Sequence, residues 1–399
     1  MNKNTTNYEI KKLKVAEVNV DFYNDKVLYT MKALITIALV LVYCIGLPSS
    51  TLAANNSPAK DRANVGKITI EVDPRVELIG IVFRLAGNPE FNNGVLRPYA
   101  KVIERHFGDF DNHAAVKLAA ELRYKRSMSC DGPMSLAVHI DRDFHPRKTF
   151  EEWPWGLDYR WEKQETAEFV EKLQQFAAET KFDEFFKAQS EIYEKGIRSC
   201  EDLMAQLDTG TWLADFFGVK ECGDLKLVLG FVNGFCSYGV RFTTEGTSEK
   251  YAIVGMRPFD PANTVIFRPI QIGTTVHEFC HSFVNPVVKK YIDQMQPAGK
   301  RLFATHGPAM RMSGYQKWQT VMYETAVRAC VMSFVRHSFE PMYMDYYLKD
   351  EVKAGFIWTE DMGNFLKTYE NNRDKYPTFE SFFPEFVAFF NGYSEKVKL

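Results

Sequence analysis

The chain of 399 residues has no excess of charge of either sign, since 49 Lys and Arg stand against 51 Asp and Glu. Without a basic surplus or a polybasic run beside an amphipathic stretch, the composition predicts no partnership with nucleic acid or with a membrane surface. The chain also has no internal repeat, which excludes repeat architectures. Its length and its 46% hydrophobic content suffice for one large domain or two smaller ones with a sizeable core.

Long apolar runs are equally scarce, and the longest, at 33–47, is shorter than the about 20 residues that span a membrane. A lysine precedes this run, and small residues up to Ala54 follow it, which is the pattern of a signal peptide and its cleavage site. We therefore predict a signal peptide at 31–54, with 1–30 as an overhang or a misassigned start. The alternative is an N-terminal membrane anchor. The signal peptide predicts export of the bacterial type, to the periplasm or beyond, with no stable membrane span after cleavage.

The cysteines identify no metal site of their own. Their spacings match neither a zinc ribbon nor a zinc knuckle, and export permits disulfides without fixing which cysteines pair. Cys280 and Cys330 lie in apolar stretches with helical character, so we interpret them as small buried residues.

The periodicity of apolar residues divides the chain into a helical part, a short β part and a second helical part. Two stretches, 77–85 and 135–140, fit a strand or a helix. β-type runs are predicted at 66–72, 225–232, 236–242, 251–256 and 264–267. Helices are predicted at about 97–107, 112–125, 162–207, 275–284, 287–295, 313–337, 359–370 and 378–391. This pattern is typical of a mostly helical α+β fold with a small, mainly antiparallel sheet. We expect the chain to divide into regions 55–224 and 225–399, or to form one continuous domain over 64–399.

One segment carries recognisable chemistry, the H-E-x-x-H sequence from His277 through Glu278 to His281. Residues four apart share one face of a helix, so both imidazoles can bind one Zn²⁺ at about 2.0–2.1 Å. Glu278, next to the first ligand, can take a proton from a water on the metal and pass it to a leaving group. The motif therefore predicts a zinc-dependent hydrolase, and we expect its substrates to be peptides or proteins.

The residues around the motif support a metal helix inside the protein, because 274–276, 279–280 and 282–283 are all uncharged. The alternative is a pair of buried, hydrogen-bonded histidines with a buried glutamate. That arrangement is costly unless a partner charge is near.

A catalytic zinc site takes a third protein ligand and keeps one position for water. The longer metzincin motif is missing, because Val284 replaces its glycine and Val287 its third histidine. Instead, 285–286 (Asn-Pro) is expected to stop the helix soon after His281.

Glu324 is the best candidate for the third ligand, because it is the only acidic residue between Asp293 and Glu340 and has apolar neighbours. Arg328, one turn later, could orient Glu324 or hold a substrate carboxylate. The alternatives are a plain Glu324–Arg328 ion pair and His306 as the third ligand.

The oxyanion of a tetrahedral intermediate needs a hydrogen-bond donor. Tyr315, which begins the segment that carries Glu324, is our first choice, and His306 and Tyr323 are the others. Packing in the core or at its rim is the alternative for all three. The runs 236–242 and 264–267 are candidates for an edge strand along which a peptide could lie.

The segment 277–283 (HEFCHSF) resembles the motif of a family of exported bacterial proteins that is catalogued as a domain of unknown function and grouped with zincin metallopeptidases. The stretches 74–78, 314–315 and 323–329 are also similar to that family, and the resemblance covers roughly 64–399. It implies a zincin-like, gluzincin-type fold with the sheet next to the H-E-x-x-H helix. It also implies two histidine ligands and Glu278 as the base, but no substrate. Arg328 departs from better-known gluzincins, which have an acidic residue at that position.

Three functions therefore remain open from the sequence. The first is a zinc peptidase, the second is a zinc hydrolase of a non-peptide bond, and the third is an exported binding protein with a vestigial metal site. Glu278 favours an enzyme, because a purely structural site would not need it.

Overall fold

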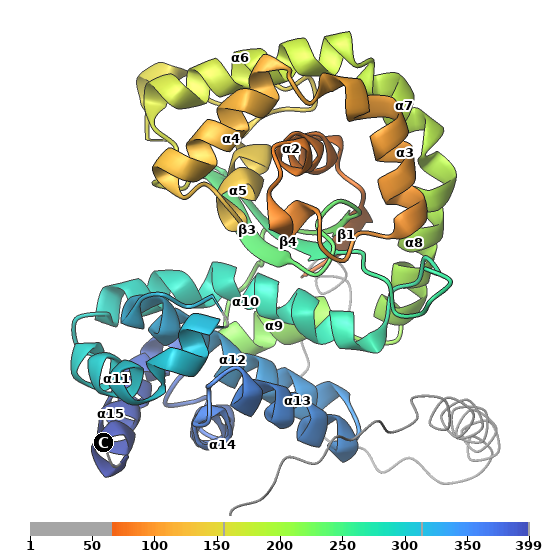
Figure 1. The fold of residues 1–399 in the computed structure, drawn as a ribbon. Coiled ribbons are helices and arrows are strands. Elements are labelled where there is room, and N and C mark those ends of the chain that lie inside the picture. The colour runs from red at the N-terminus through yellow and green to blue at the C-terminus, as the bar shows by residue number, and fades with distance from the viewer. Residues whose placement is uncertain (1–65, 155, 313, 398–399) are drawn as a thin grey trace, which may run out of the picture. The chain divides into compact units, whose positions relative to one another are not determined.

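The computed structural model describes residues 66–154, 156–312 and 314–397, so the predicted overhang at 1–30 and signal peptide at 31–54 lie outside the described residues. Most of the described residues lie in helices, and the strands among them form one sheet (Figure 1). Within the same ranges, none of the helices combines the length and the apolar character that a membrane span requires.

The sheet is mixed, with the strand order β1-β2-β4-β3. β1 pairs with β2 and β2 with β4 in parallel, whereas β3 and β4 form an antiparallel hairpin. The prediction of a mainly antiparallel sheet was therefore wrong. The alternation of side chains sets which face of a strand is buried, but it does not set the neighbour that the strand takes. The strands are β1 (Ile68–Glu71), β2 (Asp224–Gly230), β3 (Ser237–Thr244) and β4 (Thr247–Gly255).

β2 and β4 are the inner strands of the sheet. Both have apolar runs in their sequences, which is typical of strands that are covered on both faces. Leu227 and Val228 of β2, and Tyr251 to Val254 of β4, are almost fully buried. The predicted strand at 264–267 was wrong, since these residues form an irregular connection before the next helix.

The helices before β2 match most of the predicted stretches. Both ambiguous stretches are helical, and Asp73 begins the first of these helices by accepting a hydrogen bond from the backbone N–H of Arg75. The long stretch at 162–207 is divided into three helices. The elements are α2 (Pro74–Leu85), α3 (Arg97–Phe107), α4 (Ala114–Arg126), α5 (Asp131–His139), α6 (Lys163–Glu179), α7 (Phe182–Ala188), α8 (Ser190–Met204) and α9 (Thr209–Phe217).

Three of the helices after the sheet continue through a proline, which is Pro286, Pro308 or Pro384. The expected stop at 285–286 was wrong, because α10 runs past Pro286. An internal proline costs about 3 kcal/mol, but burial of Val287 and Val288 beyond it is worth about 1.5–3 kcal/mol each. The elements are α10 (Pro269–Tyr291), α11 (Gln296–Met312), α12 (Trp318–Ser338), α13 (Pro341–Lys353), α14 (Thr359–Glu370) and α15 (Phe379–Lys396).

The contact between β3 and α10 depends on a glycine. A Cβ atom added to Gly239 would lie 2.3 Å from the backbone oxygen of Glu278 and 3.1 Å from Cβ of His281. The strand therefore comes this close to the helix only because residue 239 has no side chain. α12 packs against α10 as well, so the H-E-x-x-H segment lies where a strand edge and a second helix meet (Figure 1).

A carboxyl group is buried in the N-terminal part of the core. Glu77 of α2 is fully buried and accepts hydrogen bonds from the Tyr99 hydroxyl at 2.6 Å and from the Phe231 backbone N–H at 2.7 Å. Burial raises the pKa of Glu77 from 4.5 to about 7, although these hydrogen bonds oppose the rise. The native state therefore binds a proton at Glu77 more tightly than the unfolded chain does.

We expect this proton to make stability depend on pH. The contribution is fully present below pH 4.5 and is lost as the pH rises through about 7. Its full size is about 3 kcal/mol, since one pKa unit corresponds to about 1.4 kcal/mol. Glu77→Gln should remove this part of the loss in unfolding free energy between about pH 5 and about pH 8, measured by urea denaturation. The exposed Glu121→Gln is the control, and an unchanged pH dependence in Glu77→Gln would contradict the assignment.

Candidate metal centre

Three side chains from two helices converge on one point. His277 and His281 lie one turn apart on α10, and their Nε2 atoms are 3.2 Å apart. Glu324 of α12 faces both rings, with Oε2 at 3.4 Å from Nε2 of His277 and Oε1 at 3.4 Å from Nε2 of His281. Among the described residues, this is the group of His, Cys, Asp or Glu side chains that could hold a metal ion, with ligand atoms all within 4.8 Å of one another.

These separations fit a metal ion between the three groups. A tetrahedral ion with bonds of about 2.0–2.1 Å separates its ligand atoms by about 3.3 Å. The measured separations of 3.2, 3.4 and 3.4 Å agree with that value. Two imidazole nitrogens and one carboxylate also leave a fourth position for water, which is the composition of a catalytic zinc site.

One histidine is oriented by a residue that the sequence analysis assigned only to a helix stop. Nδ1 of His281 lies 3.2 Å from Oδ1 of Asn285, one turn further along α10. An amide oxygen only accepts hydrogen bonds, so Nδ1 carries the proton and the lone pair of the ring lies on Nε2, toward Glu324. The spacing of four residues from His281 was the signal in the sequence.

Glu324 is held from behind by a buried arginine. Nη2 of Arg328 lies 3.2 Å from Oε2 of Glu324 and donates to the Tyr315 hydroxyl at 2.7 Å, while Nη1 donates to Oε2 of Glu351 at 2.5 Å. The Tyr315 hydroxyl in turn donates to Oε2 of Glu324 at 3.3 Å. Arg328 therefore bridges two carboxylates and orients Glu324, which was one of the two roles expected for it.

Glu351 and Tyr347, both on α13, were missed by the sequence analysis. Tyr347 donates a hydrogen bond to the backbone oxygen of Arg328 at 2.8 Å. Glu351 is the only residue of α13 that is buried. The apolar residues at 342–348 follow one another too closely to mark one face of a helix, and nothing in the segment indicated a partner of Arg328.

The two acidic groups at the site are shifted in opposite directions. Burial raises the pKa of Glu278 to about 7, and the nearby carboxylate of Glu324 raises it further, whereas His277 and a hydrogen bond from the Gly239 backbone oppose the rise. Burial also acts to raise the pKa of Glu324. However, a hydrogen bond with His277, the two neighbouring imidazoles and the charge of Arg328 hold the pKa of Glu324 well below its usual range. One carboxylate is thus suited to stay charged and the other to exchange a proton.

The remaining candidates lie apart from this group or beside it. Nδ1 of His306, on α11, is 2.8 Å from the Thr305 hydroxyl, and its ring packs edge-on against Trp358. His306 is not one of the three converging side chains. Tyr323 is half-buried next to Glu324 on α12 and packs against the core. The oxyanion roles of Tyr315, His306 and Tyr323 stay predictions.

A comparison with models of protein families gives a match. A family model described as Domain of unknown function (DUF4932) matches residues 157–389, which include all three converging side chains. No curated protein and no solved structure gives a significant match.

Proposed function

Because this chain belongs to the DUF4932 family, whose function is unknown, we propose an activity from its own site: a zinc-dependent hydrolase of peptide bonds with a gluzincin-like ligand set. The observation that carries the proposal is the convergence of His277, His281 and Glu324 at the spacing of a tetrahedral ion.

Each residue has a defined task in this proposal. Two imidazole nitrogens and one carboxylate favour Zn²⁺, which when bound acts as a Lewis acid and makes a water acidic near neutral pH. Asn285 and Arg328 keep His281 and Glu324 in place. Glu278 accepts a proton at its carboxylate and returns it to the leaving amine, a task for which a pKa near 7 is well matched.

A peptide substrate is favoured by the position of β3. This strand pairs with β4 on one side only, so within the described residues its other edge has no partner strand. Gly239 of this strand touches α10 at Glu278. An extended peptide can add to such an edge through backbone hydrogen bonds, which would bring a peptide bond close to the base.

Two other functions are compatible with parts of the site. The same groups could hydrolyse a non-peptide acyl bond, and assays with ester and amide substrates distinguish that case. A binding protein with a vestigial metal site is less well supported. Burial of the Glu278 carboxyl group costs free energy, and such a protein would have no use for this group.

The first test is the metal content. Protein purified without chelator should contain about one zinc per chain by elemental analysis. The double variant His277→Ala, His281→Ala should lose it, because Glu324 alone cannot hold the ion. His145→Ala, at an exposed histidine with a nearby carboxylate, is the matched control. A wild-type protein without zinc, or a double variant that retains it, would refute the proposal.

A further inference from the structure

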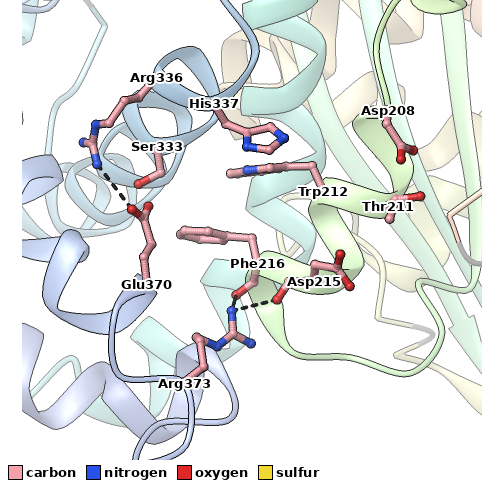
Figure 2. Close-up of a pocket in the computed structure, with 10 residues that line it drawn as sticks. All are labelled: Asp208, Thr211, Trp212, Asp215, Phe216, Ser333, Arg336, His337, Glu370 and Arg373. Carbon is pink, nitrogen blue, oxygen red and sulfur yellow. Dashed lines mark hydrogen bonds and ion pairs between the residues drawn. The ribbon is translucent and has the colours of Figure 1, made fainter. Parts of the chain in front are cut away.

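A pocket of about 610 Å³ lies between α9, α12 and α14 (Figure 2). It is separate from the metal centre, although both use α12. Ser333 on the pocket wall follows Glu324 by nine residues, which places it on the opposite face of the helix and about 13 Å along its axis. The volume is in the range of small-molecule sites.

One wall of this pocket is aromatic. The rings of Trp212 and Phe216, both on α9, are stacked with centroids 4.7 Å apart and an angle of 15° between their planes. Phe334 packs edge-on against Trp212 from α12 and fixes its orientation. Figure 2 shows these two parallel rings reaching from α9 toward α12 and α14. Such a wall suits a planar apolar group.

Two buried hydrogen-bond donors at the pocket have no acceptor. The Ser333 hydroxyl and Nε of Arg373 are buried and have no hydrogen-bond partner in the described part of the chain, and Ser333 is 3% exposed. An arginine nitrogen can only donate. The terminal nitrogens of Arg373 donate to backbone oxygens of Asp215 and Pro377, both at 2.8 Å. No carboxylate is paired with Arg373 among the residues described.

Arg336 adds a positive charge one turn from Ser333 on the same face of α12. Its guanidinium uses one N–H on Glu370 at 3.4 Å and another on the backbone oxygen of Gly363 at 2.9 Å, which leaves N–H groups available. The acidic residues on the α9 side, Asp208 and Asp215, are exposed, so water can satisfy their carboxylates. Both groups that lack a partner can donate a hydrogen bond, and with Arg336 beside them they favour an acceptor that carries negative charge.

We propose that this pocket binds a small aromatic carboxylate. Its ring would lie against Trp212 and Phe216, and its carboxylate would accept hydrogen bonds from Ser333 and Arg336. The site is independent of the proposed hydrolase activity.

The test compares three probes of one shape in calorimetric titrations of the full chain. These are 3-phenylpropionate, its neutral amide, and 3-phenylpropylamine, a cation. The carboxylate should bind at one site per chain at least about tenfold more tightly than the amide, with the amine weakest. Each titration is repeated with a metal chelator, because a carboxylate can also bind a metal ion. Binding by the carboxylate that disappears with the chelator would assign it to the metal centre and overturn the proposal.

Substitutions in the pocket test whether 3-phenylpropionate binds there. Ser333→Ala removes a hydroxyl that has no partner, and Arg336→Gln removes the charge, so each should weaken 3-phenylpropionate at least about fivefold without loss of zinc. Arg198→Gln is the matched control, because Arg198 also pairs with one surface glutamate, at 3.2 Å. Thermal melts verify folding of each variant. Equal affinity in wild type and both pocket variants, equal or tighter binding of the amine, or no binding of the carboxylate at millimolar concentration would each overturn the proposal.

Discussion

Glu278→Gln should abolish most hydrolysis and leave the metal bound. Glutamine has nearly the same shape but cannot take a proton, and a positioned base contributes about 10²–10⁴-fold to the rate. Glu278 is not one of the three converging ligand side chains, so zinc should remain at about one per chain. The measurement is kcat/KM on a peptide substrate together with elemental analysis of the same sample.

The control for this variant is Glu380→Gln, an exposed glutamate on α15 that pairs with Lys290. It should keep both activity and zinc. If Glu278→Gln lost zinc along with its activity, Glu278 would be a ligand or a structural residue and the role of base would be wrong. If the variant kept full activity, the proposed reaction would need another proton acceptor.

The sequence predicted the local half of this site because helix geometry fixes it. Residues four apart on a helix share a face, so His277 and His281 had to meet. Glu324 could be chosen only by elimination, as the one acidic residue between Asp293 and Glu340. The structure brings its carboxylate to both imidazoles.

Other parts of the site depend on tertiary contacts, which no local sequence pattern predicts. Glu351 belongs to α13, a helix that the sequence did not predict because its apolar residues cluster at 342–348 and mark no single face. Asn285 was interpreted through the proline that follows it, whereas tertiary packing carries α10 past that proline. The order of strands was not predictable either. β3 and β4 pair in the antiparallel way that was expected, but β4 lies between β2 and β3 and pairs with β2 in parallel.

Glu324→Ala should weaken zinc binding by more than the roughly 10–100-fold that loss of an outer residue produces. Its carboxylate faces both imidazoles at 3.4 Å, so the variant would leave the ion with two neutral ligands. Arg328→Ala should have the milder effect, because Arg328 only orients Glu324. Zinc affinity is measured by competition with a chromophoric chelator, and thermal melts follow the fold.

The competing interpretation is that Glu324 serves only as the buried partner of Arg328. Arg328 also pairs with Glu351 at 2.5 Å, so it would keep one carboxylate in Glu324→Ala. Glu351→Gln is therefore the matched control, since it removes the other partner of Arg328 and leaves the converging side chains intact. If Glu324→Ala and Glu351→Gln both lowered the melting temperature and neither changed zinc affinity beyond about tenfold, Glu324 would not be a ligand. His306→Ala would then be the next variant to measure, because His306 is the remaining candidate for the third ligand.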